Sequence, residues 1–298
     1  MGWRTVIVTK HSKISYKMET VIIQTDDDVI HIPISDIQIL LIATTQAVIT
    51  THLIMEFAKN DVKVIFTDNK QMPIGEFNIY YSNLNRNKNI AKQINWCTKR
   101  KGIIWQSIIK MKIENQAKLL EKYNCQKYDG QPGNKDLEDL IPEIKIDDST
   151  NREAVAARMY FQRLFETYFS RRNEEFVING FLNFGYTVFL SFISQEICCA
   201  GYLTELGIHH SSSENFYNLS SDLIEPFRFF VDELAFHKSE NSDFCLDDKL
   251  EIVSLLNKTV STSEGDAVLS SVIKSFVRKS LKYLSEETDE VPRIEFNI

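Results

Sequence analysis

Glycine is scarce in this sequence, with ten in 298 residues, and no glycine-rich nucleotide loop is present. The chain contains no P-loop, no Rossmann fingerprint and no G-x-S-x-G elbow around a nucleophilic serine. It therefore lacks the motifs that hold ATP or a dinucleotide, and serine-hydrolase chemistry is a poor candidate.

Cysteine is also sparse. Five cysteines, an odd number, form no C-x-x-C pattern, and Cys198 and Cys199 are adjacent within an apolar stretch. We expect reduced, mostly buried thiols, as is typical of a cytoplasmic protein.

No targeting or membrane segment is evident. The start, MGWRTVIVTKHSK, has no apolar signal-peptide core, and Val6 stands where a myristoylation signal needs Ser or Thr. The most apolar long stretch, 187–206, contains Gln195, Glu196 and Glu205, so it predicts a core helix rather than a membrane span. We expect a soluble cytoplasmic protein with no membrane partner.

Basic residues do not dominate: 34 Lys and Arg face 41 Asp and Glu, which argues against wholesale nonspecific adhesion to nucleic acid. Their distribution is uneven, because ten cations between residues 81 and 122 are opposed only by Glu114 and Glu121. These cations are Arg86, Lys88, Lys92, Lys99, Arg100, Lys101, Lys110, Lys112, Lys118 and Lys122. A second stripe recurs every four residues: Lys274, Arg278 and Lys282. Each set is either a solvated helix face or a surface for a polyanion.

The hydrophobic periodicity changes along the chain. Short β-branched runs with a period of two fill the first third: TVIV, KISYK, TVIIQT, VIHIPI and IQILLI. A helix at 51–61 and a strand at 62–68 follow, and later segments predict helices at 103–123, 152–169, 181–203, after Pro226, at 247–257 and at 265–284. We predict an α+β fold of about two domains: a small N-terminal β-rich domain (1–80), a linker (81–95) and a larger all-helical domain (96–298).

Two acids stand three residues after a residue that favours a helix N-cap. Thr150 precedes Glu153, and Asp222 precedes Glu225, so each pair fits a capping box, and Pro226 suits a first helical turn. The same geometry fixes the direction of a carboxylate that binds a ligand. Capping and ligation both stay open at this point.

A histidine pair follows the long apolar helix. His209 and His210 lie in a polar, serine-rich loop that leads back to Asp222. Two acids and an imidazole form a mixed oxygen and nitrogen set suited to Mg²⁺ or Mn²⁺. Such a cation activates a hydroxyl or water and stabilises charge on a phosphoryl oxygen, which favours phosphodiester chemistry.

In their order, the segments resemble a known family, the Cas1 integrases of CRISPR adaptation, in the form that accompanies type II systems. The resemblance rests on the combination of NREAVAAR, NFGYTVFLS, LGIHH, SDLIEPFR and the tail VPRIEF, together with MGWRTVIVTKHSKISYK and TTQAVITTHLIMEFAKNDVKVIFTD near the start. Single motifs are weak, but their order and spacing are specific.

The resemblance implies roles for particular residues. Glu153, His210 and Glu225 match the family's catalytic metal ligands, Asp222 matches a neighbouring acid, and the motif positions Arg228, Asn183 and Tyr186 are expected to support or line the site. It also implies a homodimer built through the β-rich domain, two such dimers bridged by a Cas2 dimer, and metal-dependent insertion of short DNA fragments into a CRISPR repeat. The DNA-binding candidates are Arg86, Lys88, Lys92, Lys274, Arg278 and Lys282.

Two other functions stay open. A stand-alone, structure-selective DNA nuclease would use the same residues with water as the nucleophile. A non-catalytic scaffold would use Glu153 and Glu225 only as helix caps. The aromatic residues Trp96, Trp105, Tyr160 and Phe161 fall on apolar helical stripes, so we expect core packing rather than stacking on DNA bases.

Overall fold

A computed structural model describes residues 4–69, 72–77, 83–127, 130–165, 169–173 and 176–298. The chain divides into two compact units, residues 1–84 with 198–201, and residues 85–197 with 202–298. The predicted boundary near residue 80 falls outside the described residues. Within the predicted linker, residues 86–94 form a helix.

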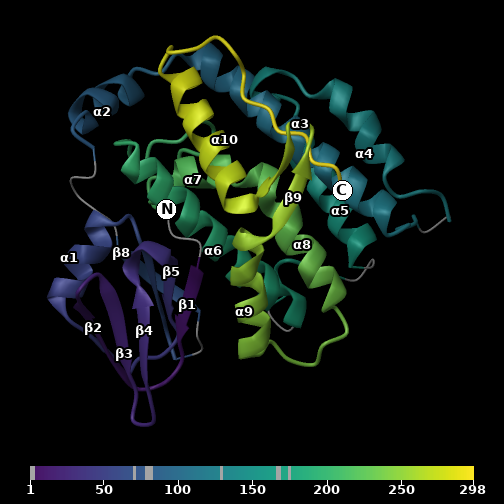
Figure 1. Cartoon of the computed structure of the whole chain (residues 1–298). Helices are drawn as coiled ribbons and strands as arrows, with labels where there is room; N and C mark the ends of the chain where they lie inside the picture. The colour runs from purple at the N-terminus through teal and green to yellow at the C-terminus, as the bar shows by residue number, and fades with distance from the viewer. Residues whose placement is uncertain (1–3, 70–71, 78–82, 128–129, 166–168, 174–175) are drawn as a thin grey trace. The chain divides into compact units, whose positions relative to one another are not determined.

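The first unit is built from two four-stranded sheets (Figure 1). One has the order β1-β5-β7-β8, with β1, β5 and β7 parallel and β8 antiparallel. The other has the order β4-β3-β2-β6. The strands are β1 (Arg4–Val8), β2 (Ser12–Lys17), β3 (Thr20–Gln24), β4 (Val29–Pro33), β5 (Ile37–Ile42), β6 (Ala47–Ile49), β7 (Lys63–Thr67) and β8 (Pro73–Phe77). The predicted strands of the first third are confirmed.

Alternation explains the core of this unit. Ile14 in β2 and Val21 in β3 are fully buried, as expected where one sheet face packs inward. Helix α1 (Thr51–Lys59) adds Leu53 and Phe57 to the same cluster. Its first turn is capped by Thr50, whose hydroxyl accepts a hydrogen bond from the Leu53 N–H at 3.4 Å.

The second unit is mainly helical. Its α-helices are α2 (Arg86–Ile94), α3 (Thr98–Lys122), α4 (Lys135–Leu140), α5 (Arg152–Leu164), α6 (Val177–Cys199), α7 (Asn218–Leu223), α8 (Arg228–His237), α9 (Leu246–Ser254) and α10 (Leu269–Leu284). Short 3-10 turns include η3 (Ile146–Asp148) and η4 (Glu225–Phe227). Helix α3 packs against α4, α5, α8 and α10, so it is the axis of the unit (Figure 1). Residues 166–168 of the predicted 152–169 helix lie outside the described residues.

Helix α6 is the one described helix that is long and apolar enough to cross a membrane by length and composition alone. Of its most apolar window, 67% is buried inside the structure, which is the burial of a core helix. At Gly185 a Cβ would lie only 2.3 Å from Val231 Cγ1 of α8. The glycine of the NFGY motif thus permits close contact between these two helices.

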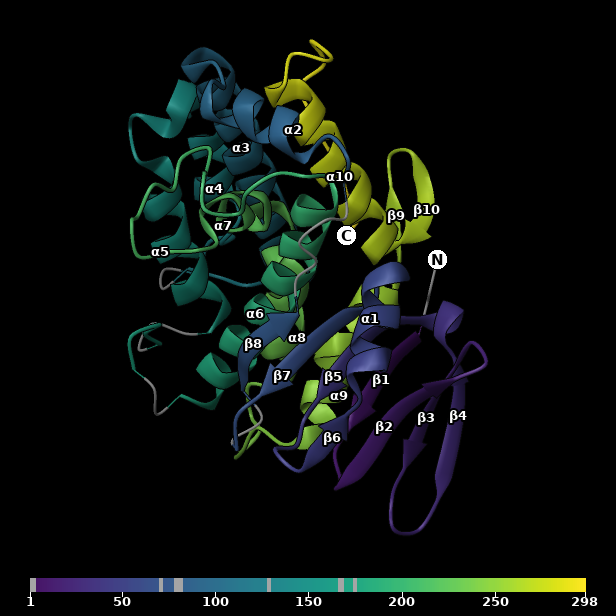
Figure 2. The same ribbon diagram turned by 90° about the vertical axis from the view of Figure 1, so that its left-hand side faces the viewer.

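The second unit is not all-helical. Strands β9 (Thr259–Thr262) and β10 (Gly265–Val268) form an antiparallel hairpin beside α10 (Figure 2). The predicted helix 265–284 therefore begins only at Leu269. The reason is local, because Gly265 adopts φ +114°, a conformation that suits a tight turn and not a helix.

The thiols also differ from expectation. None of the five cysteines, all of which the structure describes, is in a disulfide; Cys97 and Cys245 are exposed and the other three are partly buried. The prediction of mostly buried thiols is wrong, because the chain places each at the end of a helix or in a connecting turn, outside the packed helix faces.

Candidate active site

The first turn of α5 is not capped by Thr150. The Asp148 carboxylate accepts the N–H groups of Arg152 and Glu153, both at 2.9 Å. Asp148 and Asn151 adopt positive φ, which brings this carboxylate under the helix. The Thr150 hydroxyl is buried without a hydrogen-bond partner. The predicted Thr150 capping box is therefore wrong, and the Glu153 side chain points to another partner.

Asp222 is not a helix cap either. It lies in α7, is fully buried, and its carboxylate accepts the N–H groups of Ile208, His209 and His210 at 2.5, 3.2 and 3.1 Å. It thereby folds the LGIHH loop around itself. At Gly207 a Cβ would lie 2.3 Å from the His210 carbonyl and 2.8 Å from the Asp222 carboxylate, so the loop requires glycine there.

The same carboxylate orients the imidazole of His210. His210 Nδ1 lies 2.7 Å from Asp222 Oδ1, and because a carboxylate accepts, Nδ1 carries the proton and Nε2 is directed elsewhere. The hydrogen bond to Asp222 raises the pKa of His210, and the charges of Glu225 and Glu153 add to the rise. The two glutamates and the imidazole therefore share one electrostatic environment.

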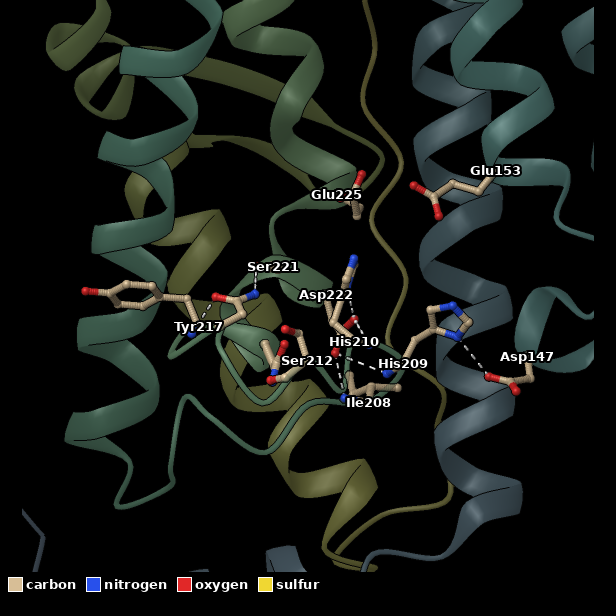
Figure 3. Close-up of polar contacts among 12 residues, drawn as sticks. Asp147, Glu153, Ile208, His209, His210, Ser212, Tyr217, Ser221, Asp222 and Glu225 are labelled. Carbon is tan, nitrogen blue, oxygen red and sulfur yellow. Dashed lines mark hydrogen bonds and ion pairs between the residues drawn. The ribbon is translucent and has the colours of Figure 1, made fainter. Parts of the chain in front are cut away.

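Glu153 and Glu225 meet at a lysine. Lys112 Nζ lies 2.6 Å from Glu153 Oε1 and 2.6 Å from Glu225 Oε2. Arg228 contacts the other Glu225 oxygen at 2.9 Å. Burial alone would raise the pKa of Glu225, but Arg228 and Lys112 outweigh it and lower that pKa below its usual value. Figure 3 shows the Glu153 carboxylate reaching from α5 toward the turn that carries Glu225.

The donor set fits a hard divalent cation. Within the described ranges no three His, Cys, Asp or Glu side chains stand together as a preformed metal cluster. However, Glu225 Oε2 is buried and makes no hydrogen bond, although the Lys112 ammonium lies beside it. A positive charge already lies between two carboxylates, and oxygen and imidazole donors are those preferred by Mg²⁺ and Mn²⁺.

The predicted supporting residues fall in two places. Arg228 pairs with Glu225 and stacks on the Tyr186 ring, with its guanidinium carbon 4.6 Å from the centroid. The Tyr186 hydroxyl donates to the buried Asp232. Asn183 is exposed, and its side-chain carbonyl accepts from Arg171 at 2.8 Å. Of the three, only Arg228 therefore contacts Glu225, and Tyr186 contacts Arg228.

Sequence reasoning missed two buried residues. Lys112 was grouped with cations expected at the surface, either on a solvated helix face or facing a polyanion, and Asp232 was not considered. Burial raises the pKa of Asp232 to about 6, although the hydroxyls of Tyr186 and Tyr160 donate to it. The sequence spacing could have indicated Asp232, because it stands one helical turn after Arg228.

The histidine loop also contacts α3 and the turn before α5. The His209 ring lies 4.5 Å from the buried Trp105 ring, nearly parallel at 5°. Its Nδ1 lies 3.2 Å from Asp147, in the turn before α5 (Figure 3). Trp96, Trp105 and Tyr160 are buried and Phe161 is partly buried, as the prediction of core packing required.

The DNA-binding candidates lie on two helices. Arg86, Lys88 and Lys92 lie on α2, where Lys92 pairs with Glu287 at 2.7 Å. On α10, Lys274 and Arg278 both pair with Glu196, at 3.1 and 3.4 Å, and Lys282 is exposed. Several of these cations are thus partly neutralised within the chain, and their contact with DNA stays a prediction.

Comparison with known proteins identifies the family. Residues 5–256 match the sequence model described as CRISPR associated protein Cas1. The chain belongs to the Cas1 family. It is 31% identical over 245 residues to the CRISPR-associated endonuclease Cas1 of Neisseria meningitidis serogroup C (strain 8013), covering 80% of this chain and 77% of that relative. A Cas1 endonuclease of Francisella tularensis subsp. novicida (strain U112) is 25% identical over 227 residues, with 70% of each chain covered.

Solved structures show the same fold. A casposase bound to integration product has a TM-score of 0.75 at 20% identity, covering 97% of this chain and 92% of that one. A CAS1 protein from Thermotoga maritima has a TM-score of 0.71 at 16% identity, with 94% and 97% covered. A chain of a Cas6-RT-Cas1–Cas2 complex aligns with a TM-score of 0.77 at 19% identity, over 99% of this chain and 36% of that larger one.

Proposed function

We propose that this Cas1-family chain is a metal-dependent DNA integrase of CRISPR adaptation, with DNA endonuclease activity, which joins 3′-hydroxyl ends of a short DNA fragment to a CRISPR repeat. One observation supports this above the others. Two carboxylates from separate segments meet at a single cationic group, next to an imidazole that a buried aspartate orients. Because neither Glu153 nor Glu225 caps a helix, the argument for a non-catalytic scaffold loses its basis.

Glu153, Glu225 and Nε2 of His210 are the residues that would hold Mg²⁺ or Mn²⁺. When bound there, the cation would lower the pKa of a hydroxyl and stabilise charge on the phosphoryl oxygens. Arg228 keeps Glu225 ionised, and Asp222 keeps the His210 ring in one orientation and tautomer. These residues thus keep Glu225 charged and the His210 ring in a fixed orientation before DNA arrives.

The proposed reaction is a transesterification. The 3′-hydroxyl of the incoming strand loses its proton and forms a bond to phosphorus, and the bond to the 3′-oxygen of the repeat strand breaks. That oxygen leaves and takes up a proton. One phosphodiester replaces another, so no energy cofactor is needed, in keeping with the missing nucleotide loops.

The proposed partners are DNA and a Cas2 dimer, with this chain acting as a homodimer and two dimers in the full assembly. Two solved structures of the same fold support these partners by their composition: one contains an integration product, the other Cas1 with Cas2. Backbone contacts would come from the cations on α2 and α10, and binding should weaken steeply with salt.

A stand-alone nuclease is the second candidate, because both curated relatives are named endonucleases. Hydrolysis would use water in place of the 3′-hydroxyl at the same site. A product gel with purified protein, Cas2, DNA and Mn²⁺ separates the two. Longer, joined strands support integration, and only shortened strands support hydrolysis.

The residue assignment is tested in the same assay with Glu153→Gln, His210→Gln and Glu225→Gln. Each should abolish strand transfer, whereas Glu240→Gln, at an exposed acid after α8, should leave it unchanged. If two of the three site variants transfer strands at nearly the wild-type rate, the assignment is wrong.

A further inference from the structure

Lys112 lies in the middle of α3 and is buried, unlike the half-buried Lys110 and Lys118 that flank it in the sequence. Three residues further along the helix, the Asn115 amide donates to the Pro226 carbonyl at 2.9 Å. This bond ties α3 to the turn that carries Glu225. The Lys112 backbone is therefore held at a fixed distance from the turn, and its four-carbon stem has several rotatable bonds through which the ammonium can change position.

The two glutamates need a positive charge. Two carboxylates that share a buried site repel each other, and without a cation one of them would take up a proton or move away. The Lys112 ammonium contacts one oxygen of each, at 2.6 Å. Burial would lower the pKa of Lys112, but Glu225 and Glu153 outweigh it and leave that pKa raised.

We propose that Lys112 is a resident counter-ion of the Glu153–Glu225 pair, which holds the two carboxylates together and which an incoming divalent cation must displace. The inference rests on the proposed metal-dependent function and adds a determinant of metal affinity. The ammonium and a divalent ion cannot both lie between the same two oxygens. The apparent metal affinity of the wild-type chain therefore includes the free energy of breaking both lysine contacts.

Arg228 differs from Lys112 in this respect. It contacts Glu225 Oε1, the oxygen that faces away from Lys112, and its guanidinium is stacked on Tyr186. It can therefore stay in place when the other oxygen changes partner. Removing Lys112 takes away the competitor for the metal but leaves Glu225 with one cationic neighbour.

The test is a Mn²⁺ titration by calorimetry of the full-length wild type, Lys112→Met and the control Lys99→Met, an exposed lysine of the same helix. Lys112→Met should bind Mn²⁺ about tenfold or more tightly than wild type, within the usual range of coupling between sites. Its unfolding temperature without metal should be lower, and Mn²⁺ should raise that temperature more than it does for wild type. Lys99→Met should match wild type.

The outcomes separate this inference from the proposed function. If the wild type binds Mn²⁺ and Lys112→Met binds it equally or more weakly, Lys112 is not a competitor and the inference fails, while the metal site stands. If the wild type binds no Mn²⁺ at these residues, the proposed function fails. Should Lys112→Met not fold without metal, Lys112→Gln, which is neutral but can still donate to one carboxylate, replaces it with the same expected direction.

Discussion

The Asp222→Asn substitution probes how the LGIHH loop is held. Asp222 is buried, and its two oxygens accept four hydrogen bonds, from the N–H groups of Ile208, His209 and His210 and from the His210 ring. Asparagine has the same shape but only one acceptor oxygen. Whichever way its amide turns, the NH₂ group faces donors, and about half of the four bonds are lost.

The magnitude follows from those bonds. A hydrogen bond to a charged group contributes about 1.5–3 kcal/mol, and a buried unsatisfied donor adds to the loss. We therefore expect the free energy of unfolding to fall by about 3 kcal/mol or more. Residues that orient a metal ligand typically change metal affinity or activity by about 10–100-fold, and we expect that loss in Mn²⁺ binding.

Urea unfolding and Mn²⁺ calorimetry on Asp222→Asn measure both effects, with the exposed Asp243→Asn as the control. Wild-type unfolding and wild-type Mn²⁺ affinity in Asp222→Asn would refute the orienting role of Asp222. Normal stability with complete loss of Mn²⁺ binding would also refute it, because that result indicates a direct ligand.

Two further predictions concern buried positions in α8 and α6, Asp232 and Gly185. The pKa of Asp232 is raised to about 6 in the folded chain, so the folded state holds its proton longer than the unfolded state and stability falls as pH rises from about 4 to 6. In urea unfolding between pH 4 and 7, the stability of wild type relative to Asp232→Asn should fall by about 2–3 kcal/mol, and a pH-independent difference would contradict this. Gly185→Ala should lower the free energy of unfolding by about 1–3 kcal/mol, because its Cβ would clash with Val231. Adding Val231→Ala should relieve the clash and restore part of the lost stability. Gly75→Ala, where a Cβ has no neighbour within 4 Å, should not lower the free energy of unfolding in this way. If Val231→Ala does not restore stability, the clash with Val231 is not the cause of the loss.

The elements that sequence predicts well are those with a strong local pattern. Alternating β-branched runs gave β1 to β5, and α1 follows from its apolar stripe. Glu153, His210 and Glu225 were proposed from motifs; in the structure Glu153 and Glu225 both contact Lys112, and His210 is bonded to Asp222. Their roles remain to be measured.

The errors have separate physical causes. A helical stripe does not show which cation turns inward, so Lys112 was counted with the solvated lysines. The Thr150 capping box was wrong because Asp148 reaches the α5 start through left-handed backbone conformations at Asp147, Asp148 and Asn151. The Asp222 box was wrong because that carboxylate accepts the N–H groups of residues 208–210 instead. The four-residue strands β9 and β10 are too short for periodicity to separate from a helix start.

The central claim is that Glu153, Glu225 and His210 bind one divalent cation in the place of the Lys112 ammonium. Crystals grown with Mn²⁺, analysed by anomalous diffraction at the manganese edge, test it most directly. One strong peak per chain is expected, about 2.0–2.3 Å from both carboxylates and from His210 Nε2, with Lys112 moved out. A peak elsewhere, or saturating Mn²⁺ with no peak and Lys112 still between the two glutamates, would contradict it.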